Sequence, residues 1–267
     1  MLTGCRPKGG NMTAHNPVPE ERRPRDAAHW ARRVERIRVP DASGAAPNVE
    51  GRRMVGPLQG FGKMWQKTYK TRLEGVRVAP AVVVETLKER FPEISGFGDG
   101  FRMPAGGLVP GAVALLGGLS GVVVLYADDE SFTYMTPEGH PFSGWITFSS
   151  YAEEDGTTVA QAQLLIRAAD PIYEIMMPLG LHRLEDTTWQ RALGRVADHF
   201  GAAGRVETRV TCVDPRRQWR RYTNVRHNAL VLSALHAATA PLRWIKRRAT
   251  DVGRTPRTRN QTKGGTR

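Results

Sequence analysis

The stretch from Val122 to Ile166 constrains the fold most, because it reads as a series of short strands joined by turns. Runs rich in Val, Ile, Thr, Phe and Tyr end at Gly, Pro or Asp, and this happens about every ten residues, which is typical of an antiparallel meander. The clearest turn signal is Asp155-Gly156, because glycine adopts positive φ without steric cost. We therefore predict an antiparallel sheet at the centre of the chain.

The segments on either side of the meander add a strand and a helix before it and a helix after it. Residues 63–73 alternate as a strand, with one face made of Trp65, Lys67, Tyr69 and Thr71. A helix follows from Pro80, where proline is tolerated, and a further strand spans residues 111–116. After the meander, residues 179–200 change to helical spacing.

Apolar residues at helical spacing predict the buried face of each helix. In the first helix this stripe is Val82, Val83, Leu87 and Phe91; in the last it is Leu181, Leu184, Thr188, Ala192, Val196 and Phe200. A long helix that follows an antiparallel sheet must bury its stripe on one face of that sheet. We therefore expect an α+β fold in which an antiparallel sheet curves around a long C-terminal helix.

Charge is unevenly distributed along the chain, which has a formal net charge of +13. Residues 61–204 carry 12 Lys and Arg against 17 Asp and Glu, whereas residues 205–267 carry 16 against 3. Proline-rich, arginine-rich ends cannot bury enough apolar surface to offset their ordering entropy. We predict a disordered basic arm (1–55), the sheet domain (56–204), a basic strand and helix extension (205–249) and a disordered basic tail (250–267).

The basic C-terminal extension suggests a phosphate-bearing partner, either an anionic membrane surface or nucleic acid. Arginines alternate there with the aromatic residues Trp219 and Tyr222, and Trp244 follows. The alternative is a segment that only improves solubility. The residues expected to contact anions are Arg216, Arg217, Arg220, Arg221, Lys246, Arg247 and Arg248.

Cysteine content and hydropathy bear on the compartment. Cys5 and Cys212 do not form a disulfide framework and have no metal-binding spacing, which favours a reducing cytosol. No run reaches the roughly 18 apolar residues that a spanning helix needs. We expect a cytoplasmic protein, peripheral to the membrane under the second hypothesis, with no cofactor or metal. Its oligomeric state stays open.

A turn in the meander carries a family resemblance. The segment 132–148 contains Gly139-His140-Pro141, then Gly144 and a strand. Together with the element order over residues 62–201, it resembles the helix-grip fold of the START-like (SRPBCC, polyketide cyclase and lipid transport) superfamily. It is most similar to an uncharacterised bacterial and plant family with a Gly-His-Pro turn. Residues 145–147 stand where that family has acidic residues, so no carboxylate role is carried over.

The resemblance implies an apolar cavity between the sheet and the last helix, which would hold an apolar or amphipathic small molecule. The small residues Ala160 and Ala162 share a strand face and either leave this space or make room for a tryptophan in a solid core. Arg167, at a strand end, would clamp a carboxylate or phosphate, or pair with Asp170. The expected wall and ligand-binding residues are Tyr134, Trp145, Ala162, Ile166, Arg167 and Trp189.

Two histidines are candidates for acid-base chemistry in a third hypothesis, an enzyme of cyclase or hydrolase type. His140 is either a proton shuttle or a structural residue bonded to nearby backbone. His182 and Asp186 are four residues apart on the last helix, so they form either an oriented imidazole pair or an exposed surface pair. With Glu185 they lack a further ligand elsewhere, so no metal site is predicted.

Overall fold

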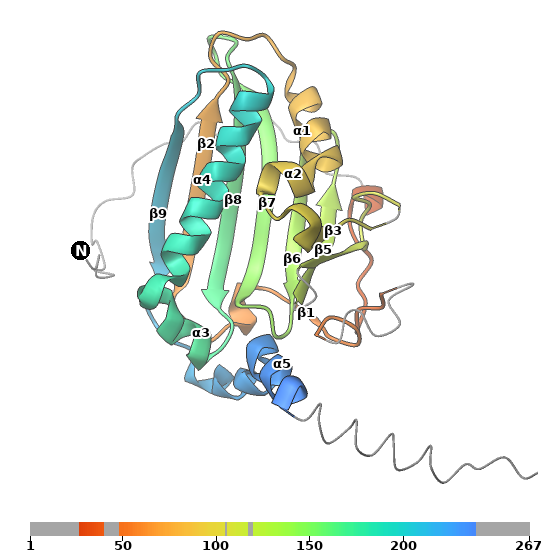
Figure 1. The fold of residues 1–267 in the computed structure, drawn as a ribbon, viewed down its shortest axis with the longest axis vertical. Helices are drawn as coiled ribbons and strands as arrows, with labels where there is room; N and C mark the ends of the chain where they lie inside the picture. Colours follow the sequence, from red (N-terminus) through yellow and green to blue (C-terminus); the bar gives the residue numbers. More distant parts are fainter. Residues whose placement is uncertain (1–26, 40–47, 105, 117–119, 239–267) are drawn as a thin grey trace, which may run out of the picture.

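The computed structural model describes residues 27–39, 48–104, 106–116 and 120–238. Within this part of the chain an open, antiparallel nine-stranded sheet forms the centre of an α+β fold (Figure 1). The strand order is β3-β4-β5-β6-β7-β8-β2-β9, and β1 pairs with β6. The strands are β1 (Met54–Val55), β2 (Met64–Arg72), β3 (Phe101–Arg102), β4 (Val113–Leu116), β5 (Ser120–Ala127), β6 (Ser131–Pro137), β7 (Phe142–Ala152), β8 (Thr158–Ala168) and β9 (Val206–Asp214).

The predicted meander is confirmed as β5 to β8, which pair in sequence order. The turn between β7 and β8 closes with Glu153 N–H donating to the Thr157 carbonyl, and Gly156 has φ +81°. The register places Phe148 opposite Ala162. The residues on the Ala162 face of β8 are all buried, as the alternating pattern predicted.

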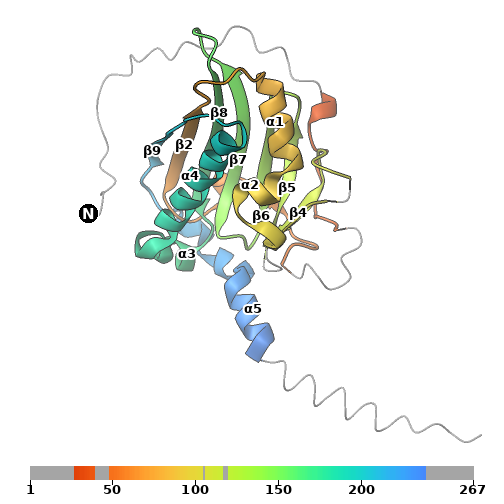
Figure 2. The ribbon, with the colours of Figure 1, turned by 45° about the horizontal axis from the view of Figure 1, so that its top comes forward.

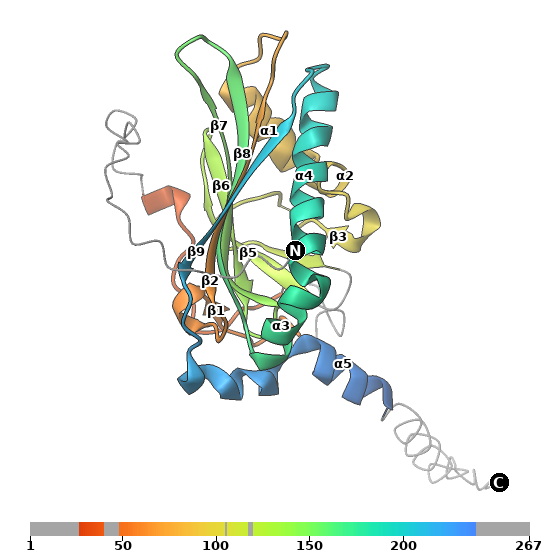
Figure 3. The same ribbon diagram turned by 90° about the vertical axis from the view of Figure 1, so that its left-hand side faces the viewer.

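Three helices cover one face of the sheet, called here the inner face: α1 (Pro80–Glu89), α2 (Phe91–Ser95) and α4 (His182–His199). Figure 3 views the sheet along its edge and shows these helices together on one side. The core between the layers is rich in aromatic rings. Its aromatic members include Phe91, Phe101, Phe132, Tyr134 and Phe148.

The buried face of α4 differs from the predicted stripe. Leu184 is 66% exposed, and the inward position is taken by Glu185, which is 7% exposed. Further along, the helix buries Ala192, Leu193 and Val196. The predicted stripe was wrong at Leu184 because it assumed that only apolar residues face the sheet. The first turn of α4 instead buries Glu185, which pairs with Lys67 on β2. In α1, likewise, Val82 is exposed and Val84 is buried.

The last helix is also preceded by a separate short helix. α3 (Pro171–Met176) begins at Asp170, whose carboxylate accepts hydrogen bonds from the Ile172 and Tyr173 N–H groups. A π-helical turn (Met177–Leu181) then leads into α4, and Gly180 within it has φ +136°. A helical run cannot continue evenly through a left-handed residue, so α3 and α4 are distinct elements.

Strand β9 belongs to the same sheet as the meander. It pairs antiparallel with β2 from Met64 to Thr71, so the predicted domain boundary at residue 204 falls inside one continuous sheet. Without β9, the backbone groups of β2 would form an unpaired edge. A 3-10 helix, η5 (Trp219–His227), and α5 (Ala229–Ala238) follow it. Figure 2 shows α5 extending away from the sheet.

Part of the N-terminal arm lies on the outer face of the sheet, which differs from the disorder that we predicted for residues 1–55. Ile37 and Val49 are buried against Leu115 and Val123 of β4 and β5. Ala31 N–H donates to the Leu125 carbonyl at 2.8 Å. Without the arm, Leu115 and Val123 would expose an apolar surface to water. Burial of this surface stabilises the contact with the two short apolar segments of the arm around Ile37 and Val49.

Candidate functional site: a buried charged cluster between β2 and α4

A lysine is buried between the sheet and α4 and pairs with two carboxylates. Lys67 on β2 is fully buried, and its Nζ lies 2.8 Å from Glu185 Oε2 and 2.7 Å from Asp186 Oδ1. The Tyr69 hydroxyl donates to the same Asp186 oxygen at 2.6 Å. We call these four residues the Lys67 cluster.

The local sequence explains how the cluster forms. Side chains two residues apart on a strand point to the same face, so Lys67 and Tyr69 both point inward from β2. Glu185 and Asp186 are adjacent in the first turn of α4. Adjacent helical residues diverge around the axis, which is why the Glu185 side chain is 5% exposed and that of Asp186 is 30% exposed.

Burial makes Glu185 the titratable member of the cluster near neutral pH. Removal from water raises the pKa of its carboxyl to about 7, and the nearby Asp186 adds to this, although Lys67 opposes it. When Glu185 is protonated, the Lys67 ammonium is balanced by Asp186 alone. When Glu185 is ionised, the buried cluster carries one excess negative charge, which is costly in a medium of low polarity.

Among the described residues, four polar atoms on the inner side of the sheet are buried and have no hydrogen-bond partner. They are Glu185 Oε1, Thr71 Oγ1, the Tyr134 hydroxyl and Ser120 Oγ. Thr71 follows Tyr69 on the inward face of β2, and Tyr134 lies in the same cross-strand row as Lys67, with Ile146 and Leu164 between them. Since buried polar atoms nearly always have a partner, such atoms indicate a place where another molecule can supply one.

His182 lies beside the cluster but outside its hydrogen bonds. Its ring meets the Trp65 ring edge to face at a centroid distance of 4.8 Å. Burial and the charge of Lys67 lower the pKa of His182 to about 4. The predicted His182–Asp186 pair is wrong as a hydrogen bond, because Asp186 Oδ1 instead accepts from Lys67 and Tyr69.

His140 has a structural environment. The Phe142 N–H donates to its Nδ1 at 3.1 Å, and desolvation lowers the pKa of His140 to about 4. The turn that carries it contacts the C-terminal segment: Ala229 N–H donates to the Gly139 carbonyl, and a side chain at Gly139 would meet the His227 carbonyl at 2.2 Å. These contacts favour the structural interpretation of His140 over a proton shuttle.

The predicted wall residues divide between the two faces of the sheet. Tyr134, Ala162 and Ile166 belong to the buried inner core, and Trp189 packs on Phe148 at a ring distance of 5.6 Å. Trp145, in contrast, lies on the outer face, opposite Leu165 and Met135. Its placement in the wall was wrong, because Ile146 and Gly144 take the inward positions of β7.

Arg167 also points to the outer face and is bonded within the protein. Its guanidinium donates to the Gly62 and Arg216 carbonyls and pairs with Asp214 at 2.6 Å. Arg167 therefore ties β8 to the chain after β9, and its partner is Asp214, not Asp170, which caps α3. Its Nε is buried without a hydrogen-bond partner among the described residues, and its role as a ligand clamp stays a prediction.

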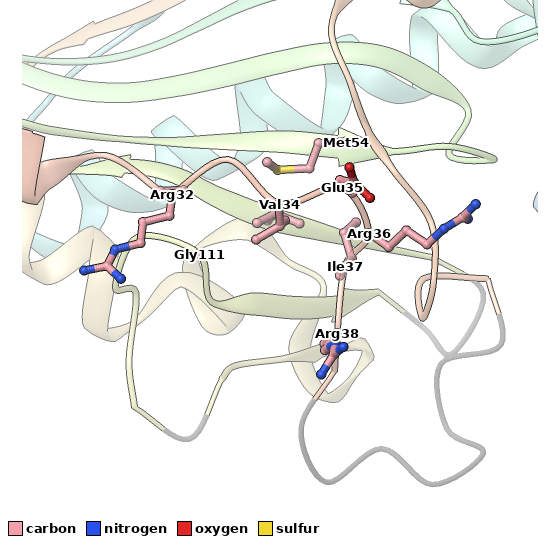
Figure 4. A pocket seen from close by; sticks show the side chains of 10 residues that line it. Arg32, Val34, Glu35, Arg36, Ile37, Arg38, Met54 and Gly111 are labelled. Atoms are coloured by element: carbon pink, nitrogen blue, oxygen red, sulfur yellow. The ribbon is translucent and has the colours of Figure 1, made fainter.

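Two hollows lie on the outer face of the sheet. The larger, of about 470 Å³, is beneath the N-terminal arm around Val34, Ile37 and Met54. Figure 4 shows that Arg32 and Arg36 at its rim point away from each other, so they do not converge on one anion. The smaller, of about 210 Å³, is lined by Gln66, Trp145 and Gln163.

The predicted anion-binding residues are described only in part. Arg216 and Arg220 are exposed, and Arg216 pairs with Asp214. Arg217 pairs with Glu174 at 2.9 Å, and Arg221 is partly buried. The remaining ones, together with Trp244 and the predicted tail, lie outside the described residues: Lys246, Arg247 and Arg248.

Strand alternation correctly predicted the face of β2 on which Lys67 lies, but the ion pair of Lys67 with Glu185 was not predicted. The available signal was a lysine at an inward position of β2 and a glutamate one turn into the closing helix, which together satisfy the rule that a buried charge needs a partner. Within the described residues, no group of three His, Cys, Asp or Glu residues could hold a metal ion. None of the described helices is both long and apolar enough to cross a membrane.

The comparisons with known proteins do not identify a related site. No protein-family model matches the chain, and a search of curated proteins finds no match. Among solved structures, a structural-genomics target from Nitrosospira multiformis is similar at 18% identity, over 50% of this chain and 95% of that one, with a TM-score of 0.35.

Proposed function

We propose that the protein binds an apolar or amphipathic small molecule between the sheet and α4, with the polar end of the molecule at the Lys67 cluster. The observation that carries the proposal is Glu185 Oε1, a buried carboxyl oxygen with no hydrogen-bond partner, on a residue whose other oxygen is held by Lys67. A ligand group placed there would complete the hydrogen bonding of the cluster.

The architecture supports the proposal through its resemblance to helix-grip proteins. Two helices, α1 and α2, lie between β2 and β3 along the chain, and α4 follows β8. The strands from β3 to β8 are adjacent in order, β2 lies beside β8, and β9 pairs with the other edge of β2. This order is consistent with the helix-grip arrangement that the sequence resembles, in which the ligand is held between the sheet and the final helix. The Lys67 cluster lies on that side of the sheet.

The chemistry of the cluster favours a hydroxyl as the polar end of the ligand. A hydroxyl donates to Glu185 Oε1 when that carboxylate is ionised and accepts from it when it is protonated. Because the pKa of Glu185 is raised to about 7, both states occur near neutral pH. The rest of the ligand would lie against the aromatic core, so the rings of Trp189 and Phe148 must move to admit it.

The test is ligand retention by the full chain. Native mass spectrometry and solvent extraction of the purified protein should find a bound small molecule that contains a hydroxyl. Ala162→Trp should abolish the bound mass, because Ala162 is fully buried opposite Phe148 and an indole would fill the ligand space. Glu185→Gln should weaken retention by about tenfold, since one hydrogen bond to a charged group contributes about 1.5 kcal/mol.

Trp145→Ala is the matched control, because Trp145 lies on the outer face and should leave ligand retention unchanged. Circular dichroism would establish that each variant is folded. A ligand retained equally by folded Ala162→Trp, or a wild-type protein that takes up no hydrophobic dye and retains no molecule, would contradict the proposal.

A further inference from the structure

We propose that one end of the molecule, formed by α3, the π-helical turn and η5, docks on an anionic lipid bilayer. Figures 1 and 3 both show these elements together at the same end, below the sheet. Helix α3 contacts η5, and Glu174 of α3 forms an ion pair with Arg217, just before η5. We call this region the α3/η5 end. The inference does not depend on what the interior binds.

Large aliphatic side chains are exposed at the α3/η5 end. Ile175, Leu179 and Leu184 are 63%, 79% and 66% exposed and follow one another along α3, the π turn and the start of α4. Single exposed aliphatic residues are common on protein surfaces, but several along one short segment mark an interaction site. Leu184 directly precedes Glu185, but adjacent helical residues diverge around the axis, so Leu184 faces solvent while Glu185 is buried.

The adjoining η5 segment supplies aromatic and cationic groups. Trp219 and Tyr222 are 70% and 60% exposed, and these residue types favour the boundary between lipid head groups and acyl chains. Arg216 and Arg220 are exposed beside them. No Asp or Glu occurs between Asp214 and Asp251.

The nearest acidic side chains offset only part of this positive charge. Glu174 is buried and paired with Arg217, and Asp214 is paired with both Arg167 and Arg216. The α3/η5 end therefore presents cations together with apolar groups. This combination is complementary to a bilayer surface that carries negative charge.

The aliphatic residues distinguish a bilayer from nucleic acid. Arginine and tryptophan alone would suit either partner, because tryptophan stacks on bases as well as entering the lipid interface. Ile175, Leu179 and Leu184 offer no stacking face and no hydrogen bond, so nucleic acid would leave them exposed. A bilayer buries them, and each aliphatic side chain transferred from water strengthens binding by roughly tenfold or more.

The experiment is vesicle co-sedimentation of the full chain, using vesicles of phosphatidylcholine alone and of phosphatidylcholine with phosphatidylserine. We expect binding that requires phosphatidylserine, decreases with added salt, and shifts the tryptophan fluorescence to shorter wavelength. Leu179→Glu should reduce binding at least about tenfold. Arg220→Gln should reduce it about fivefold, the effect of one cation near an anionic surface.

Val82→Glu is the matched control. Val82 is also an exposed aliphatic residue on a helix, with 46% exposure, but α1 lies at the opposite end of the sheet (Figure 1). Its vesicle binding should equal that of the wild type. Ala162→Trp should likewise leave vesicle binding unchanged, which separates this inference from the proposed ligand site.

Three results would overturn the inference. One is equal binding to vesicles with and without phosphatidylserine. The second is unchanged binding by folded Leu179→Glu. The third is binding of a single-stranded oligonucleotide, but not of vesicles, which would assign the arginines to nucleic acid instead.

Discussion

At the scale of single residues, the Lys67 cluster combines burial with incomplete charge balance. Two carboxylates face one ammonium group, and all of Lys67 is removed from water. Removing one member of a buried ion pair leaves the other uncompensated, which typically costs 3–5 kcal/mol. The cluster therefore holds α4 against β2 only while its lysine is present.

A substitution of Lys67 tests this dependence. Lys67→Met should lower the free energy of unfolding by about 3 kcal/mol or more, because it leaves Glu185 and Asp186 without a cation. Lys70→Met is the control: Lys70 follows on the same strand but bonds the Tyr151 hydroxyl from the outer face, so about 0.5 kcal/mol is expected there. Urea denaturation measures both. If both variants lost the same free energy of unfolding, the buried ion pairs of Lys67 would stabilise the fold no more than a surface contact does.

The pH dependence of stability follows from the Glu185 carboxyl. Its pKa in the folded protein, about 7, lies above its ordinary value of 4.5, so between these values the folded state holds a proton that the unfolded state has lost. Stability from this group is therefore full below pH 4.5 and is lost as the pH rises towards 7, with a slope of at most about 1.4 kcal/mol per pH unit.

Histidines act in the opposite direction over part of the same range. The pKa of His182 is lowered from 6.5 to about 4, so its contribution is present above pH 6.5 and is lost as the pH falls towards 4. The difference in unfolding free energy between wild type and Glu185→Gln isolates the glutamate. That difference should decrease from pH 4.5 to 7, and a difference that stays constant would contradict the raised pKa.

At the scale of elements, periodicity predicted the strands and helices but not every buried face. The meander, β2 and the first helix could be predicted from the sequence, because alternation and helical spacing follow directly from the direction of the side chains. The face of α4 was misassigned at Leu184, because a buried Glu185 depends on Lys67, which is distant in sequence. Ile37 and Val49 gave too weak a local signal to predict contact with β4 and β5. Long-range partners decided each of these positions.

Two glycines of the β7–β8 hairpin test how closely these strands pack. Gly144 and Gly156 both have positive φ, +154° and +81°. A Cβ at Gly144 would lie 2.1 Å from the Leu165 carbonyl oxygen, whereas at Gly156 it meets nothing within 4 Å. Gly156→Ala should cost about 1–2 kcal/mol from backbone strain alone. Gly144→Ala should cost at least twice that, since backbone atoms must also move, and thermal unfolding would show the difference.

At the scale of the whole molecule, the predicted domain of residues 56–204 is incomplete, because β9 forms the edge strand of the sheet beside β2. A strand was predicted in this extension, but its pairing partner was not, since β2 lies far away in sequence. The pairing of β2 with β9 and the bonds of Arg167 to Asp214 and Arg216 join the segment after α4 to the sheet.

Truncation tests whether the sheet needs β9. A chain that ends at residue 204 leaves β2 as an exposed edge and removes the carboxylate partner of the buried Arg167. It should aggregate, or unfold at least about 5 °C earlier, as expected for a loss of about 2–3 kcal/mol or more. A chain that ends at residue 238 keeps all the described contacts of β9, η5 and Asn228, and should unfold like the full chain. Both are compared by thermal denaturation and size-exclusion chromatography. If the shorter chain stays monomeric with an unchanged midpoint, β9 adds nothing to the stability of the sheet, and the boundary at residue 204 would be a true domain end.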